Sequence, residues 1–156
     1  MIRVVLPSNN GSSRIELQFG GRLDFQGSPG LEADVSVHGK NWAHDDEADL
    51  SARIQSSCIS LEALISLSRD LDRWLGLDLE DLDPDKLSQT YELAFPRNNS
   101  LKLVFGQRSD TVSGLNPVVT FEYASGAFEG QFHFATDQSG LREFNDSLRG
   151  VLRDAA

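Results

Sequence analysis

The chain has 156 residues, 39% of them hydrophobic and 24% charged, a composition that is typical of one folded domain and excludes a disordered chain. The formal net charge is −10, and residues 1–78 and 79–156 each contribute 7 basic and 12 acidic residues. Because neither half forms a basic region, we expect no nucleic-acid partner, and an anionic membrane surface is disfavoured for the same reason. A basic protein partner would be attracted, although acidity also serves solubility.

Cysteine content and the first residues indicate the compartment. Cys58 is the only cysteine, so no internal disulfide can form, which suits a reducing environment. The N-terminal residues lack the apolar core of a signal peptide, and no apolar run approaches the roughly 18 residues of a membrane span. We expect a cytoplasmic protein.

The first half alternates apolar and polar residues, and a period of two predicts strands with one buried face. The predicted strands are residues 2–6, 14–25, 31–38 and 50–59. Gly20 and Gly21 interrupt the second strand, which predicts a bulge or a tight bend.

A helix is predicted at residues 61–75, where apolar residues, including Ile65 and Trp74, recur at helical spacing. Ser60 is the predicted N-cap, since its hydroxyl can accept a hydrogen bond from a free amide of the first turn. Gly76 is predicted to end the helix in the left-handed conformation, and Trp74 is predicted to be core.

The second half repeats this order after an acidic connector at residues 77–88. The predicted strands are residues 91–95, 101–105, 119–123 and 128–134, and a helix closes the chain at residues 141–152. In the last strand Phe132 and Phe134 share the buried face, so His133 points away from them toward solvent.

The order of strands, helix, strands and helix predicts a single α+β domain over residues 1–156. We expect a mainly antiparallel sheet of about seven to eight strands, built from two meander–helix units with both helices packed on one side.

The first candidate site is the polar loop at residues 38–49. It contains the imidazoles of His38 and His44 among acidic residues, which are the ligand types for a divalent metal, but the spacing fits neither a HExxH helix nor an EF-hand. The alternative is a solvated acidic turn, and Trp42 is either an exposed anchor or a residue folded over the sheet edge. As partner-binding residues we predict Trp42, Asp45, Asp46 and Glu47, with no metal.

The second candidate site is the acidic connector, in which leucines alternate with carboxylates. It is either a docking patch for a basic partner or a polar linker pinned by Leu79 and Leu82, in which Asp83 and Pro84 begin a short helical turn. Its predicted partner-binding residues are Asp78, Glu80, Asp81, Asp83 and Asp85.

Catalytic motifs are absent from the sequence. No serine stands in a GxSxG turn, the glycines form neither GxGxxG nor a P-loop, and Cys58 has no basic neighbour along the chain. We therefore expect no enzyme, no catalytic residue and no cofactor.

Three segments together resemble the WapI-type family of small cytoplasmic bacterial immunity proteins. They are Asn41-Trp42 with the acidic run into residues 49–55, the helix at residues 61–75, and the aromatic strand that leads into Asp137-Gln138-x-x-Leu141. These pieces cover roughly half of the chain. The resemblance implies a non-enzymatic protein that blocks a cognate contact-dependent or wall-associated toxin, and it supplies no catalytic residues.

Three hypotheses follow from the sequence. The first is an immunity-type protein, monomer or homodimer, that binds a protein partner such as a basic toxin domain. The second is a metal-binding protein or small enzyme that uses the loop at residues 38–49. The third is an oligomeric scaffold, because an uncovered sheet edge invites self-association.

Overall fold

The computed structural model describes residues 2–43, 46–95, 99–106 and 116–155. In this part of the chain, four strands and a helix are followed by four more strands and a second helix. The first unit consists of β1 (Ile2–Pro7), β2 (Arg14–Phe25), β3 (Ser28–Ala43), β4 (Asp46–Ser60) and α1 (Leu61–Leu75). The second consists of β5 (Gln89–Glu92), β6 (Asn99–Gly106), β7 (Val118–Ser125), β8 (Phe128–Ala135) and α2 (Gln138–Ala155). Two short turns of 3-10 helix, η1 (Leu79–Asp81) and η2 (Pro84–Leu87), connect the units.

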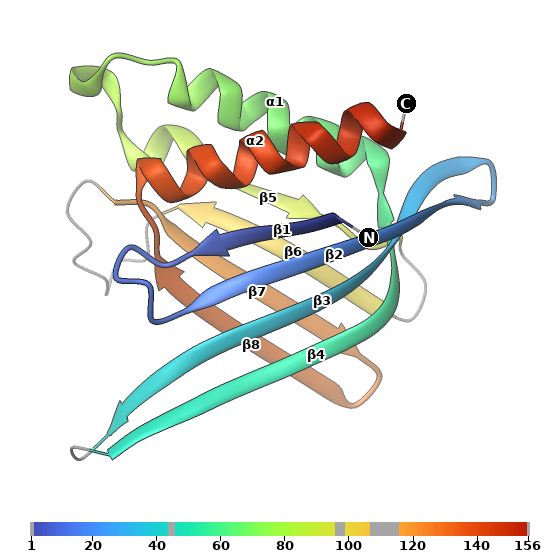
Figure 1. The fold of residues 1–156 in the computed structure, drawn as a ribbon, viewed down its shortest axis with the longest axis horizontal. Helices are drawn as coiled ribbons and strands as arrows, with labels where there is room; N and C mark the ends of the chain where they lie inside the picture. The colour runs from blue at the N-terminus through green and yellow to red at the C-terminus, as the bar shows by residue number, and fades with distance from the viewer. Residues whose placement is uncertain (1, 44–45, 96–98, 107–115, 156) are drawn as a thin grey trace.

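Each set of four strands forms its own antiparallel sheet in sequence order, β1-β2-β3-β4 in sheet A and β5-β6-β7-β8 in sheet B. The two sheets lie face to face with their strands crossing, and both helices lie along the same end of the pair (Figure 1). The predicted α+β class, the antiparallel pairing and the placement of both helices on one side are confirmed. The strands are divided between two sheets instead of joined in one.

The two sheets are joined at one corner, where β4 ends. Ile59 pairs with Ala94, and the Ser60 amide donates to the Leu93 carbonyl at 2.8 Å. Ser60 then caps α1, since its hydroxyl accepts from the Ala63 amide at 3.3 Å as predicted.

The core fills the space between the inner faces of the sheets beneath the helices. The predicted alternation is confirmed here: Leu6, Ile15 and Leu17 of sheet A and Leu103, Phe105 and Val119 of sheet B are all at most 1% exposed. The second unit's helix covers the first unit's sheet, because α2 packs along β1 and inserts the buried ring of Phe144. The two units therefore share one core.

A buried polar chain holds the two helices together. Asn145 of α2 is fully buried; its side-chain oxygen accepts from the Ser68 hydroxyl at 2.8 Å and its amide donates to Asp72 at 2.8 Å. Arg149 pairs with the same Asp72 carboxylate at 3.0 Å. The buried side chains of Asn145 and Ser68 therefore have partners, which buried polar groups require.

Local predictions for α1 have mixed outcomes. Trp74 is in the core, 3% exposed, with its indole N–H donating to the Asp83 carbonyl at 3.0 Å. Ile65, predicted on the apolar stripe, is 52% exposed, because the stripe that faces the sheets is narrower than the run of apolar residues. Gly76 is wrong as a left-handed cap: its φ is −81°, and glycine suits the site because a Cβ would lie 3.2 Å from the Asp72 carbonyl oxygen.

The predicted bulge in β2 is confirmed, since the register with β3 shifts between Phe19 and Arg22. Across the described part of the chain, neither helix combines the length and the apolar content that crossing a membrane takes.

Candidate binding cleft

The predicted polar loop at residues 38–49 is mostly strand. β3 continues to Ala43 and β4 begins at Asp46, and these two residues face each other in the ladder. The loop prediction is wrong at residues 38–43 and 46–49, because backbone pairing extends the hairpin beyond the residues whose apolar alternation marks its strands. In Figure 1 this hairpin projects beyond the rest of sheet A.

The structure places the backbone of three predicted partner-binding residues in that hairpin. Trp42 and Glu47 form one register pair, and Asp46 begins β4. The side chains of these three, and the whole of His44 and Asp45, lie outside the described residues. His38 lies on the outer face of sheet A, opposite Arg14 on β2. Among the side chains that the structure describes, no three His, Cys, Asp or Glu residues gather as a metal site.

The acidic connector carries the other predicted partner-binding residues, all of them exposed: Asp78, Glu80, Asp81, Asp83 and Asp85. The Asp83 carboxylate also caps η2, where it accepts from the Asp85 amide at 3.0 Å, so the predicted helical turn is confirmed. Leu82 is buried whereas Leu79 is 77% exposed, so only one of the two leucines pins the connector. The connector lies at the helix end of the molecule and the projecting hairpin at the far end of sheet A (Figure 1), so the structure does not bring the two acidic regions together.

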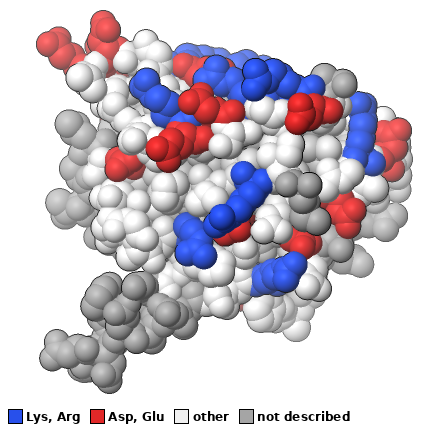
Figure 2. Space-filling view, viewed as in Figure 1, with Lys and Arg blue, Asp and Glu red and all other residues white. Residues whose placement is uncertain are grey.

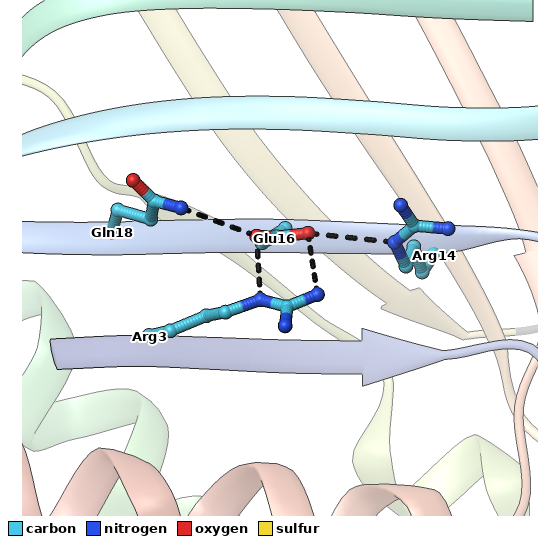
Figure 3. A network of polar contacts seen from close by, with 4 residues as sticks. All are labelled: Arg3, Arg14, Glu16 and Gln18. Atoms are coloured by element: carbon cyan, nitrogen blue, oxygen red, sulfur yellow. Dashed lines mark hydrogen bonds and ion pairs between the residues drawn. The ribbon is translucent and has the colours of Figure 1, made fainter.

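A charged network occupies the outer face of sheet A (Figure 3). Glu16 of β2, whose side chain is only 9% exposed, accepts two hydrogen bonds from Arg3 of β1, at 2.6 and 3.1 Å. Arg14 and Gln18 reach the same carboxylate at 3.4 Å. The bond from Arg3, helped by Arg14, holds the pKa of Glu16 below its usual value although burial alone would raise it.

Basic side chains stand on this face despite the acidity of the chain. Figure 2 shows Lys and Arg along the helix layer and again over the strands of sheet A, with Asp and Glu among them. Arg3 and Arg14 keep 57% and 44% of their side chains exposed while Glu16 holds them in place. The net charge of −10 therefore does not describe every face of the protein.

Two further side chains are kept in their neutral forms. Burial raises the pKa of the Cys58 thiol, which disfavours the reactive thiolate. Burial and the 2.7 Å hydrogen bond to Asp70 raise the pKa of the Tyr91 hydroxyl. Both groups are structural in these surroundings.

An apolar opening lies between the sheets, at the end away from the helices. Here the inner faces separate and leave an apolar cleft of about 470 Å³. Its walls include Val35, Val37 and Ile54 of sheet A and Phe121, Tyr123, Phe128 and Phe132 of sheet B. We call this the inter-sheet cleft.

Two residues of β8 keep the inter-sheet cleft open. Phe128 is 66% exposed, and its ring contacts Tyr123 with the ring centres 6.2 Å apart. Gly130 occupies the next inward position, where a Cβ would meet nothing within 4 Å. Phe132 marks the boundary with the core, because its ring lies where a Cβ on Gly39 would stand, at 2.7 Å.

The inter-sheet cleft is flanked by strand edges. β4 is the last strand of sheet A and β8 the last strand of sheet B. The β3–β4 register shifts between the pairs Ala33–Ser57 and Val35–Ile54, so β4 carries a bulge beside the cleft. An edge strand presents backbone N–H and C=O groups that can pair with another chain.

Sequence reasoning missed this site although it placed the residues correctly. Alternation predicts Phe128 and Phe132 on the inner face, and the structure confirms Phe132 as partly buried there. The available signal was Gly130, a glycine at an inward position of an otherwise aromatic strand, which marks a missing side chain or a close approach.

Comparison with known proteins gives little. No family model matches the chain, and no curated protein matches it. Among solved structures, that of WHY1 from Arabidopsis thaliana is similar with a TM-score of 0.43 and 8% identity, over 97% of this chain and 84% of that one.

One partner prediction is corrected at this point. The exclusion of nucleic acid as a partner is withdrawn, because Arg3 and Arg14 stand exposed on the outer face of sheet A. The exclusion relied on net charge, which sums over the whole surface, whereas binding depends on the local face. A TM-score of 0.43 assigns no ligand to this chain, so the ligand has to be argued from the inter-sheet cleft itself.

Proposed function

We propose that this protein is a non-enzymatic binding protein of the immunity type, which occupies a surface of a cognate toxin instead of transforming a substrate. The observation that carries the proposal is the inter-sheet cleft, where Phe128 is 66% exposed beside two strand edges. An exposed apolar surface of this kind marks an interaction site in a soluble domain, since leaving it in water is unfavourable.

Charge supports an encounter with a basic partner. The connector places five exposed carboxylates beside α1. The strands of sheet B carry the acidic residues Glu92, Glu122 and Glu129 together with the basic residue Lys102. Charges of one sign outside an apolar contact raise the association rate and select the partner, while the apolar contact supplies most of the affinity. The proposed setting is the cytoplasm, which suits a chain whose one cysteine is kept as a thiol.

The test is protection of cells that express the toxin domain encoded beside this gene. We expect the wild-type chain to restore growth. Phe128→Gln should lower the toxin dose that the cells tolerate at least tenfold. Ile65→Gln is the matched control, because Ile65 is a 52% exposed apolar residue on the helix layer, away from the inter-sheet cleft. Failure of the wild-type chain to protect rejects the immunity function, and equal loss in both variants rejects the cleft as its site.

A second candidate function is binding of single-stranded nucleic acid. The rings of Tyr123, Phe128 and Phe132 line one cleft with Arg53, and aromatic faces beside a cation are what unpaired bases stack on. Fluorescence anisotropy with a labelled oligothymidylate tests it. Binding that falls steeply with salt and is lost in Phe128→Gln would favour this function over the first.

A further inference from the structure

We infer that the free edge of β4 accepts an extended, basic polypeptide segment as a fifth strand of sheet A, with alternate side chains of the segment inserted in the inter-sheet cleft. This inference rests on the proposed function, for which it names the mode of docking and the chemistry of the bound segment.

The outer edge of β4 is free over most of its length. One side of β4 pairs with β3 along its length. On the other side, Leu93 and Phe95 occupy only the last residues of β4, through hydrogen bonds with Ser60 and Cys58. No described backbone hydrogen bond reaches the outer side of residues 51–57, so their outward N–H and C=O groups remain available to an added strand.

The inter-sheet cleft lies along that edge. Its sheet A wall includes Ala52 and Ile54 of β4, and its sheet B wall includes Tyr123 and Phe128. A strand added beside β4 points every second side chain to the inner face, about 7 Å apart. Those side chains would enter the space that Gly130 leaves open, where even a Cβ meets nothing within 4 Å. Main-chain pairing and side-chain insertion are thus available together, as strand addition requires.

Charge decides between the possible occupants of the β4 edge. A second copy of this chain would bring another −10, so pairing of two β4 edges is opposed by long-range repulsion. Glu122 of β7 and Glu129 of β8 lie on the outer face of sheet B, on strands whose inner residues line the inter-sheet cleft, and Glu129 is exposed. The same field attracts a segment in which apolar residues alternate with lysine or arginine.

The test uses the isotope-labelled full-length chain and an eight-residue peptide that alternates valine with lysine. We expect alternate backbone amides within residues 51–57 to exchange with solvent at least tenfold more slowly in the complex, because an added strand closes them. The matched peptide with glutamate in place of lysine should bind at least tenfold more weakly at low salt. Peptide binding without slowed exchange on β4 overturns the inference.

Two variants of the protein test whether the bound peptide occupies the inter-sheet cleft. Gly130→Val should weaken its binding at least tenfold because the new side chain fills the inter-sheet cleft, whereas Gly21→Val should not, although its Cβ also meets nothing within 4 Å. Equal binding by both variants overturns the inference, as does an oligothymidylate that produces the same amide protection more tightly than the peptide. Dimerisation of the free protein in sedimentation, with protection of these amides, would assign the edge to a second copy.

The outcome separates this inference from the function it rests on. Toxin protection without slowed exchange at residues 51–57 rejects strand addition and leaves the immunity function intact. Peptide binding at β4 in a chain that gives no protection supports the strand-addition site and rejects the immunity function.

Discussion

The two ends of the space between the sheets are built from strands with the same side-chain alternation, but one end is buried and the other is exposed. Under the helices, Leu103 and Phe105 are fully buried and Phe144 of α2 closes the layer. At the other end, Phe128 and Gly130 have the same inward orientation on β8 and remain exposed. The difference lies in what covers each end, since both helices pack at one end and none at the other (Figure 1).

Stability and binding depend on different ends of the space between the sheets. Burial of apolar surface stabilises the fold at the helix end, whereas the apolar surface of the inter-sheet cleft is left in water in the free protein. Substitutions should therefore divide by position: those under the helices change the free energy of unfolding, and those in the cleft change binding with little effect on unfolding.

The largest effect is expected for Phe144→Ala at the covered end. Phe144 is 1% exposed, and removal of a buried ring leaves a cavity, so we expect the free energy of unfolding to fall by about 3–5 kcal/mol. Urea unfolding followed by circular dichroism measures it. Phe128→Ala removes the same ring at the open end and should stay within about 1 kcal/mol of wild type. Similar losses in the two variants would contradict the division between the ends.

A smaller effect, dependent on pH, is expected for Glu16→Gln on the outer face of sheet A. Because Arg3 and Arg14 lower the folded-state pKa of Glu16 below its unfolded value of about 4.5, this carboxylate stabilises the fold above that pH. The contribution is lost as the pH falls through the folded-state pKa. We expect Glu16→Gln to cost about 1 kcal/mol at pH 7, a value limited by the exposure of both arginines, and to cost progressively less in acid.

The pH dependence of urea unfolding provides the measurement for Glu16→Gln. The difference between wild type and variant should shrink below pH 4.5. Glu129→Gln, at an exposed position of β8, is the control and should follow the wild-type curve at every pH. A difference that grows in acid would show that the arginine contacts do not stabilise the carboxylate.

Much of the fold could be predicted from the sequence because its local signals are strong. The alternation in β7 and β8 gives the correct inward side chains, and the glycine pair gives the bulge of β2. The division into two sheets could not be predicted, because side-chain alternation shows which face of a strand is buried and not which other strands share that face.

The candidate site was harder to predict for a related reason. Phe128 and Phe105 have the same pattern in sequence, yet one is 66% exposed and the other is fully buried. Exposure depends on where the helices lie, and that follows from the packing of α2 on β1, far away in the sequence. The acidic residues drew attention because charge is visible in a sequence, whereas an uncovered apolar face is not.

The smallest effect, and the only stabilising one, is expected for Gly130→Val in the inter-sheet cleft. Gly130 has an ordinary strand φ and open space at its Cβ, so valine should raise the free energy of unfolding by about 0.5–1 kcal/mol by restricting the unfolded chain. Gly39→Val is the matched contrast, because there the Cβ would lie 2.7 Å from the Phe132 ring and must push the sheets apart. Urea unfolding of the two variants should therefore give shifts of opposite sign. A destabilising Gly130→Val would mean that the sheets close over this position in solution, and the cleft would then be no site for a ligand.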